Sequence, residues 1–140
     1  MTKAIEVGCA IIREKGKTAG EGRILVAQRN QGDFLGGYWE FPGGKIEKGE
    51  TVQQCLEREV EEELGVRVRA AEFFCLKEHV YPEKTVLLHF YFCDWVSGEA
   101  EKRDCQDFRW IRPSEFKDLP FIPADTEIIN ELIRGKEKYF

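Results

Sequence analysis

Apolar and polar residues alternate along much of the chain in the way expected of β-strands. Residues 4–13, AIEVGCAIIR, and 23–29, RILVAQR, are rich in β-branched and aliphatic side chains. Residues 30–37, NQGDFLGG, form a glycine-rich loop after them. Further strand-like stretches occur at 66–79, 85–96 and 106–111. Together these stretches predict one sheet.

A helix with two defined ends is predicted in the middle of the chain. Thr51, followed three residues later by Gln54, has the spacing of a capping box, which satisfies free N–H groups at the start of a helix. Gly65 suits the left-handed conformation that ends many helices. The helix should therefore run from about residue 52 to residue 64.

A second helix is predicted near the C-terminus, in ADTEIINELIRG, where isoleucine and leucine recur at helical spacing. The 140 residues contain no internal repeat, linker or low-complexity run, and they suffice for one domain with a real core. We therefore expect residues 1–140 to form a single α/β domain in which a mixed sheet is flanked by helices.

The charge balance narrows the range of partners. The chain has 21 basic and 26 acidic residues, a net charge of −5, which disfavours non-specific binding to polyanions and anionic membranes. Its apolar runs are far shorter than the roughly 20 residues that a membrane span needs. We expect neither a nucleic-acid polymer nor a membrane as a partner, and either a monomer or a homodimer.

The cysteines indicate a reducing compartment. There are five of them and no CxxC pair, which argues against a disulfide framework and against a cysteine zinc site. The N-terminal sequence also lacks a cleavable signal pattern. A cytoplasmic location with reduced core cysteines is therefore expected.

The predicted central helix carries an unusual amount of negative charge. Residues 57–63 contain five glutamates and one arginine. At about 100° per residue, Glu59 and Glu63 project within about 40° of each other, and Glu62 lies about 60° from Glu59. These three side chains continue the apolar stripe of the helix, so we expect them on the face that the helix buries.

Carboxylates on the buried face of a helix need a partner, whereas those on a solvated face do not. Glu57 and Glu61 point the other way and are expected on a solvated face. Clustered carboxylates without equal basic partners raise one another's pKa or bind a cation, and a hard divalent ion such as Mg²⁺ fits best. The alternative is that the acids reach solvent or form salt bridges.

The same segment carries a longer motif. It reads Gly44, five residues, Glu50, seven residues, and then REVEEELGV at 58–66. This spacing resembles the Nudix box at each of its fixed positions. The fragments AIIRE, AQR, WEFPGGKIEKGE, YPEK, SGE and PAD follow the order seen in small MutT-like Nudix hydrolases. The resemblance covers nearly the whole chain, and it implies the Nudix α/β/α sandwich and hydrolysis of a nucleoside triphosphate to the monophosphate and pyrophosphate.

The resemblance also implies a metal site and a catalytic base. Glu59, Glu62 and Glu63 would ligate Mg²⁺, or alternatively Mn²⁺, together with the backbone carbonyl of Gly44. Glu59 would also activate the attacking water. Displacement at phosphorus needs cations on the phosphate oxygens, a positioned water and a base. The acidic helix would supply the metals, through its carboxylates, and the base.

Three further residues complete the implied catalytic region. Glu50 and Arg58 would pair to orient the loop and the helix. Lys45, beside the glycines, would contact the departing pyrophosphate, or else it is an exposed loop lysine.

One further metal ligand is expected from the loop after the SGE turn. Asp104 stands where MutT has a glutamate. Its shorter side chain leaves open a surface role, and Asp107 and Glu101 lie near enough in sequence to substitute for it.

Five residues match positions that line the nucleotide pocket of MutT-like enzymes. Phe41 and Tyr81 are candidates to stack on a base, or else they are core residues. Arg29 and Lys84 are candidates to hold phosphate or sugar, or else they are charges at strand edges. Asp125 completes the set.

Asp125 bears on the choice of base, because MutT has an asparagine here that reads an oxidised guanine. An ionised carboxylate only accepts hydrogen bonds, which matches the amino group of cytosine and not the O6 atom of guanine. A protonated Asp125 could donate, which would restore oxidised guanine as a candidate. Aspartate is also a common helix N-cap, so a purely structural role is a further alternative.

These residues lead to three functional hypotheses. The first is a pyrophosphohydrolase acting on CTP, dCTP or modified dCTP. The second is an 8-oxo-dGTP diphosphatase, which would sanitise the nucleotide pool. The third is a catalytically silent Nudix domain that binds a nucleotide as a regulator, although the chain keeps every glutamate of the box.

Overall fold

A mixed sheet forms the centre of the protein, which is described here over residues 4–140 of a computed structural model. The order of strands across the sheet is β3 (Trp39–Glu40), β2 (Arg23–Gln28), β1 (Ile5–Glu14), β6 (Thr85–Ser97) and β5 (Arg67–Val80). The pair β1–β6 is parallel, and the other pairs along this path are antiparallel. Strand β1 therefore lies at the middle of the sheet.

Two short strands pair with strands inside this order. Strand β4 (Gly43–Lys45) pairs antiparallel with β1, and β7 (Asp107–Ile111) pairs antiparallel with β2. The five strands predicted from alternation are confirmed to within one or two residues at each end. Alternation did not predict β3 and β4, because two or three residues are too few to establish a period.

The central helix, α1 (Val52–Leu64), begins and ends where its capping signals predict. The Thr51 hydroxyl accepts from the Gln54 N–H at 3.1 Å, and the Gln54 side chain accepts from the Thr51 N–H at 2.9 Å. Gly65 has φ of 70°, in the left-handed region where a side chain would be strained. Local chemistry alone therefore defines both ends of this helix.

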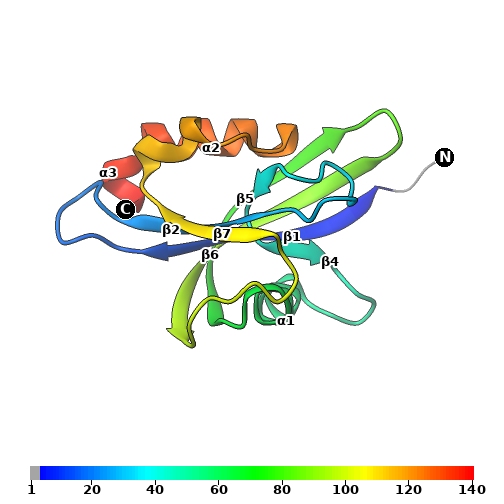
Figure 1. The fold of residues 1–140 in the computed structure, drawn as a ribbon, viewed down its shortest axis with the longest axis horizontal. Coiled ribbons are helices and arrows are strands. Elements are labelled where there is room, and N and C mark those ends of the chain that lie inside the picture. The colour runs from blue at the N-terminus through cyan, green and yellow to red at the C-terminus, as the bar shows by residue number, and fades with distance from the viewer. Residues whose placement is uncertain (1–3) are drawn as a thin grey trace.

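The C-terminal part of the chain covers the other face of the sheet. Two 3₁₀ helices, η1 (Pro113–Asp118) and η2 (Pro123–Asp125), precede α2 (Thr126–Arg134) and α3 (Lys136–Tyr139). Figure 1 shows α2 above the sheet and α1 below it, with the strands between. The predicted α/β sandwich is confirmed. Within residues 4–140, no helix is both long and apolar enough to cross a membrane.

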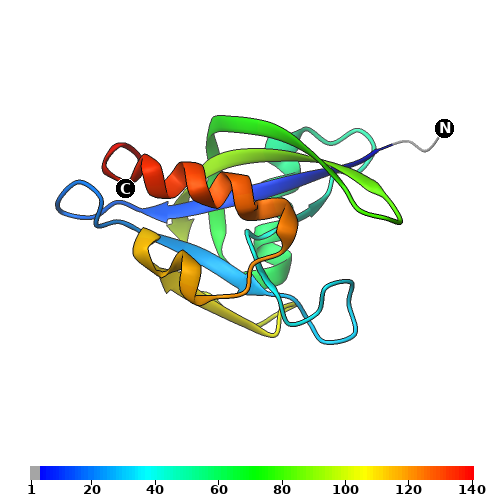
Figure 2. The same cartoon turned by 90° about the horizontal axis from the view of Figure 1, so that it is seen from above.

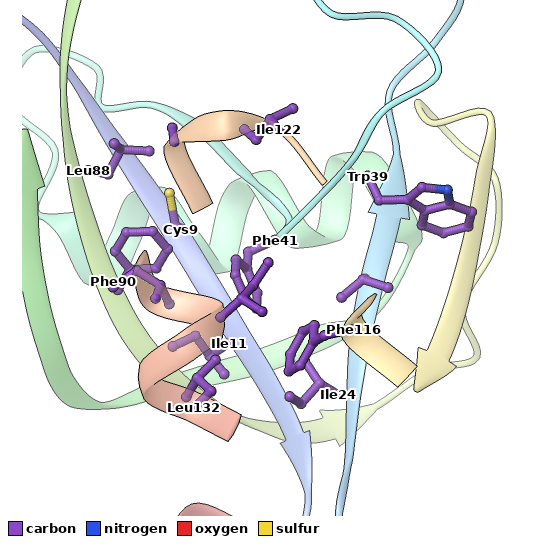
Figure 3. Packing of buried hydrophobic residues seen from close by; sticks show 14 of the residues in the cluster. Cys9, Ile11, Ile24, Trp39, Phe41, Leu88, Phe90, Phe116, Ile122 and Leu132 are labelled. Atoms are coloured by element: carbon purple, nitrogen blue, oxygen red, sulfur yellow. The ribbon is translucent and has the colours of Figure 1, made fainter. Parts of the chain in front are cut away.

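The sheet separates two apolar clusters, and neighbouring residues of β1 serve one each. Ile11 points toward α2 and packs with Phe90 and Leu132, as Figure 3 shows. Ile12 points the other way, toward Leu56 of α1. All of these side chains are at most 1% exposed, and burying each contributes about 1.5–3 kcal/mol relative to exposure. Both helices are thus held firmly against the sheet.

Two connections project from one end of the sheet. They are the loop 30–37 between β2 and β3 and the turn 81–84 between β5 and β6 (Figures 1 and 2). Leu35 in the first connection has φ of 57°, an uncommon value for a residue with a side chain. The candidate site lies between these connections and α1.

Candidate active site

A close approach between β4 and α1 builds the floor of the site. A Cβ atom placed on Gly44 would lie only 2.5 Å from the carboxyl carbon of Glu59 and 2.6 Å from one of its oxygens. Glycine at this position therefore lets the Glu59 carboxylate reach the backbone of β4. The contact brings the backbone of β4 at Gly44 next to the acidic face of α1, as the spacing of the box predicted.

Arg58 holds several of the acids in place. It makes two hydrogen bonds to the carboxylate of Glu50, from Nε at 2.7 Å and from Nη2 at 2.9 Å. Its Nη1 atom donates to Glu59 at 2.8 Å and to Glu62 at 3.3 Å. The guanidinium lowers the pKa of Glu50 to about 2, so that this carboxylate is ionised. The predicted pairing of Glu50 with Arg58 is thus present.

Glu59 and Glu63 are carboxylates in an unfavourable environment. Burial raises the pKa of Glu63 to about 9, and repulsion from Glu40, Glu59 and Asp104 adds to the effect. Burial also raises the pKa of Glu59, against the opposing influence of Arg58. The acidic side chains gathered here outnumber the arginine among them, Arg58. Such an excess of carboxyl groups is expected at a site that binds a cation.

Two predictions about the faces of α1 need correction. Glu62 was expected on the buried face, but its side chain is 58% exposed, at the rim of the site. Glu57 was expected on a solvated face, but it is half-buried and accepts from the Ala70 N–H of β5 at 3.1 Å. Glu61 is exposed as predicted. A helical projection shows only the direction of each side chain from the helix axis. It does not show how far the sheet extends around α1, and here β5 reaches Glu57 whereas Glu62 remains exposed.

The donor set suits a divalent ion, although it is not gathered into a finished cluster. In the part of the chain that the structure describes, no three acidic, histidine or cysteine side chains converge closely enough to form one. The available donors are carboxylates and a carbonyl, which are the oxygen ligands that Mg²⁺ and Mn²⁺ prefer. Glu59, Glu63 and the Gly44 carbonyl would hold such an ion, with Glu62 at the rim.

Asp104 reaches the same site from the segment between β6 and β7. Its N–H donates to the carbonyl of Glu63 at 3.0 Å, and its carboxylate accepts from the Asn30 side chain at 3.1 Å. The two acids considered as substitutes have other partners: Asp107 accepts from the Phe108 N–H at 2.8 Å, and Glu101 pairs with Arg103 at 3.3 Å. Asp104 is therefore the better placed of the three.

A cavity of about 220 Å³ runs from the glycines of β4 toward η2. All six residues predicted to contact substrate line this cavity, although they come from five separate parts of the chain. They are Arg29, Phe41, Lys45, Tyr81, Lys84 and Asp125. The cavity adjoins the metal-binding face because Gly44 lines it as well.

Of the two predicted stacking aromatics, Phe41 is a core residue. It is 3% exposed and meets the ring of Phe90 edge-on at 5.8 Å (Figure 3). Tyr81 is partly exposed at the cavity mouth, where its ring lies edge-on to Phe34 at 5.1 Å. Lys84 places its ammonium 4.2 Å from the centre of the Phe34 ring. Phe34 is thus an aromatic at the mouth that the sequence analysis missed.

Glu40 is a second residue that the sequence analysis missed. It lines the cavity, and its carboxylate accepts from Arg29 Nη1 at 2.8 Å. Burial raises the pKa of Glu40 despite the arginine. Trp39 and Phe41 on either side of Glu40 are core residues, but this segment is too short for alternation to have revealed Glu40 from the sequence. Arg29 is correspondingly not a simple charge at a strand edge.

Asp125 has the most unusual environment in the cavity. It is 1% exposed, and its side chain makes no capping hydrogen bond to α2. The Phe41 N–H donates to its carboxyl group, whereas Oδ2 has no hydrogen-bond partner within residues 4–140. Burial, and then repulsion from Glu40, raises the pKa of Asp125 well above its usual value. The N-cap alternative does not account for this side chain.

Comparisons with known proteins agree with this arrangement. The family model described as "NUDIX domain" matches residues 16–131. The chain is 34% identical to the 8-oxo-dGTP diphosphatase of Haemophilus influenzae, covering 98% of this chain and 97% of that protein. It is also 34% identical to the CTP pyrophosphohydrolase of Escherichia coli, covering 91% of this chain and 90% of that protein.

Solved structures support the same relationship. The solution structure of the E. coli ORF135 protein superposes with a TM-score of 0.81 at 31% identity, covering 99% of this chain and 94% of that one. The crystal structure of a MutT protein from Methanosarcina mazei has a TM-score of 0.80 at 22% identity and covers 98% of this chain and 97% of that one, a likeness of fold. The chain belongs to the Nudix family of hydrolases.

Proposed function

We propose that this protein hydrolyses nucleoside triphosphates to nucleoside monophosphates and pyrophosphate, with Mg²⁺ as its metal and with residues 1–140 acting as one domain. The main support is the continuity of the site: the acidic face of α1 meets the cavity at Gly44, and the cavity ends at Asp125. One end suits phosphates held through a metal, and the other suits a base. The relatives named as nucleotide diphosphatases and pyrophosphohydrolases are consistent with this division.

The protein's own residues supply most of the chemistry. A metal would be held by Glu59, Glu62, Glu63, Asp104 and the Gly44 carbonyl, and when bound it would neutralise charge on the phosphate oxygens. Glu59 takes a proton from the attacking water while the oxygen of that water bonds to phosphorus. The bond between the α and β phosphates breaks, and pyrophosphate leaves.

The basic residues in and beside the cavity have different roles. Lys45 is exposed and forms no ion pair with another residue in the described range, so its ammonium can contact the departing pyrophosphate. Arg58 holds Glu59 in orientation through its hydrogen bond at 2.8 Å. Arg29, which is paired with Glu40, and Lys84, which lies at the cavity mouth beside Phe34, can hold phosphate or sugar.

The preferred base follows from the carboxyl groups at the end of the cavity. Asp125 and Glu40 together can accept a hydrogen bond from the amino group of cytosine and donate one to its N3 atom if one group is protonated. We therefore propose CTP, dCTP or a modified dCTP as the substrate. The second candidate is 8-oxo-dGTP, which is favoured by a specific observation: a protonated Asp125 carries a donor at Oδ2 that suits the O6 atom of guanine.

A substrate panel tests both the activity and the preferred base. Pyrophosphate release would be measured with Mg²⁺ on CTP, dCTP, 5-methyl-dCTP, dGTP, 8-oxo-dGTP and a nucleotide sugar. Faster turnover of the cytosine compounds is the expected result. Preference for 8-oxo-dGTP would replace the first candidate by the second, and turnover of the nucleotide sugar alone would contradict the triphosphate assignment.

A further inference from the structure

A second cavity lies at the opposite end of β1 from the candidate active site. Its volume is about 590 Å³, within the range of small-molecule sites. Residues Ile5–Cys9 at the start of β1 include lining residues of the active-site cavity, whereas Arg13–Lys15 at its end line the second. No residue of the described chain lines both. The second cavity is therefore a separate feature of the molecule.

Three aromatic side chains line this cavity. Phe108 and Trp110 of β7 are partly buried against the cluster under α1, and Trp95 of β6 is 51% exposed. The indole N–H of Trp95 donates to the carbonyl of Gly98 at 3.0 Å, which fixes the orientation of the ring. Half-exposed tryptophan held rigidly at a cavity offers a flat surface on which another ring can stack.

The charges around the cavity do not favour a phosphate chain. Two basic and three acidic residues line it. Glu14 is paired with Arg23 at 2.8 Å, Asp94 with Arg69 at 3.1 Å and Arg13 with Glu72 at 3.9 Å. This leaves Lys15 and Glu99 as the lining residues without an ion pair to any residue in the described range. The remaining charges are one of each sign. This balance contrasts with the active-site cavity, where Arg29, Lys45 and Lys84 gather.

The segment that forms one wall of this cavity also reaches the candidate active site. Gly98, Glu99 and Ala100 line the cavity, and the same segment continues to Asp104 (Figure 1). The Glu101 N–H donates to the Leu64 carbonyl at 2.7 Å, and this bond ties the segment to the end of α1. The wall is thus anchored to a rigid element, so the cavity does not depend on a loose loop.

We propose that this cavity is a second binding site for an uncharged planar heteroaromatic compound of nucleoside size. The ring stacks on Trp95 beside Trp110. Lys15 and Glu99 supply a donor and an acceptor for its polar edge. A triphosphate is excluded because the site has no excess of positive charge to hold it. The site is distinct from the proposed catalytic site and does not depend on its function.

Titration with adenosine tests this site directly, with the indole N–H signals of the three tryptophans followed by NMR. The expected result is a saturable shift of the Trp95 and Trp110 signals, with Trp39, which is 3% exposed in the core, unaffected. Adenosine triphosphate should bind at least tenfold more weakly than adenosine. Equal or tighter binding of the triphosphate at these tryptophans would overturn the proposal.

Three variants separate this site from non-specific stacking. Trp95→Ala, and Ala100→Phe as a variant that fills the cavity while keeping both tryptophans, should each weaken adenosine binding at least tenfold. Phe73→Ala is the matched control, because Phe73 is also about half exposed, at 53%, but lies outside the cavity. Binding that survives both cavity variants, or that is absent in the unmodified protein at millimolar adenosine, would refute the site. Because no turnover is measured, this result is independent of the proposed hydrolysis.

Discussion

The two main helices lie on opposite faces of one sheet and are built on different principles. Helix α2 buries Ile128, Ile129 and Leu132 in an apolar cluster, and its exposed residues are polar. Helix α1 buries Leu56, Val60 and Leu64 but also turns two carboxylates inward.

The first arrangement stabilises the fold through burial alone. In α1, the inward carboxyl groups repel one another. The helix tolerates this repulsion because its apolar residues are firmly packed. We infer that α2 contributes mainly to stability and α1 mainly to chemistry. The following predictions separate these contributions.

The largest expected effect is on turnover, at Glu59. Glu59→Gln keeps the size of the side chain but removes the base and a metal ligand, so kcat should fall about 10³-fold. The fold should be unchanged by circular dichroism. Glu61→Gln is the matched control on the same helix, because Glu61 is exposed, and it should retain near-normal turnover. Undiminished hydrolysis by Glu59→Gln would remove Glu59 from its assigned role.

The second effect is on stability, at the helix on the other face. Leu132 is fully buried, so Leu132→Ala should lower the free energy of unfolding by about 2–5 kcal/mol, as measured by urea denaturation. At temperatures where the variant is folded, kcat should stay near normal. Leu76→Ala, at a position that is 49% exposed, should cost far less. Equal losses at the two positions would contradict the packing described here.

A third effect is the pH dependence of stability in the absence of metal. Glu63 has a pKa of about 9 in the folded protein and about 4.3 when unfolded, so the folded state binds more protons between these values. Stability contributed by the protonated group is complete below about pH 4 and is lost as the pH rises toward 9. In chelator, Tm should therefore fall across this range, and Glu63→Gln should flatten the decline. Added Mg²⁺ should raise Tm most at high pH, and a Tm in chelator that increases toward pH 9 would contradict this account.

A fourth effect concerns the choice of base. As the pH rises through the raised pKa of Asp125, this group loses its donor, so the ratio of kcat/KM for CTP over 8-oxo-dGTP should rise, by an amount on the order of tenfold. Asp125→Asn cannot titrate and should show a ratio that is constant with pH. A pH-dependent ratio that persists in Asp125→Asn would show that another group, such as Glu40, reads the base.

The smallest effect is expected at the mouth of the active-site cavity. Phe34→Ala removes the ring that contacts Tyr81 and Lys84, and it should raise KM about three- to fivefold while changing kcat little, because aromatic contacts are worth about 0.5–1.5 kcal/mol. Tyr38→Ala is the control from the same connection: Tyr38 is 41% exposed, Phe34 is 40% exposed, and Tyr38 does not line the cavity. Equal changes in both variants would point to the loop as a whole.

Features that depend on neighbours in the chain could be predicted from the sequence. The capping box at Thr51, the terminal Gly65 and the alternation in β1 and β6 each identified an element to within one or two residues. The spacing from Gly44 to Glu63 likewise indicated that backbone and carboxylates meet, since a short connection and a helical repeat leave few other geometries. These features are local, so packing did not alter them.

Other features depended on which elements pack together, and the sequence did not reveal them. Glu62 is exposed and Glu57 is bonded to β5 because of how far the sheet wraps around α1. Phe41 joined the core because β3 places it beneath η1 and α2. Glu40 and Phe34 reached the cavity from segments too short or irregular to have a period.

By itself, the sequence determined the family, the ends of α1, most strands and the position of the acidic face of α1, because each follows from residue type and spacing along the chain. The tertiary structure alone decided the exposure of Glu62, the half-burial of Glu57, the free Oδ2 atom of Asp125 and the second cavity beside Trp95. Burial and cavity shape are set by contacts between residues far apart in the chain. A pKa or a binding site that depends on them can be known only when those contacts are known.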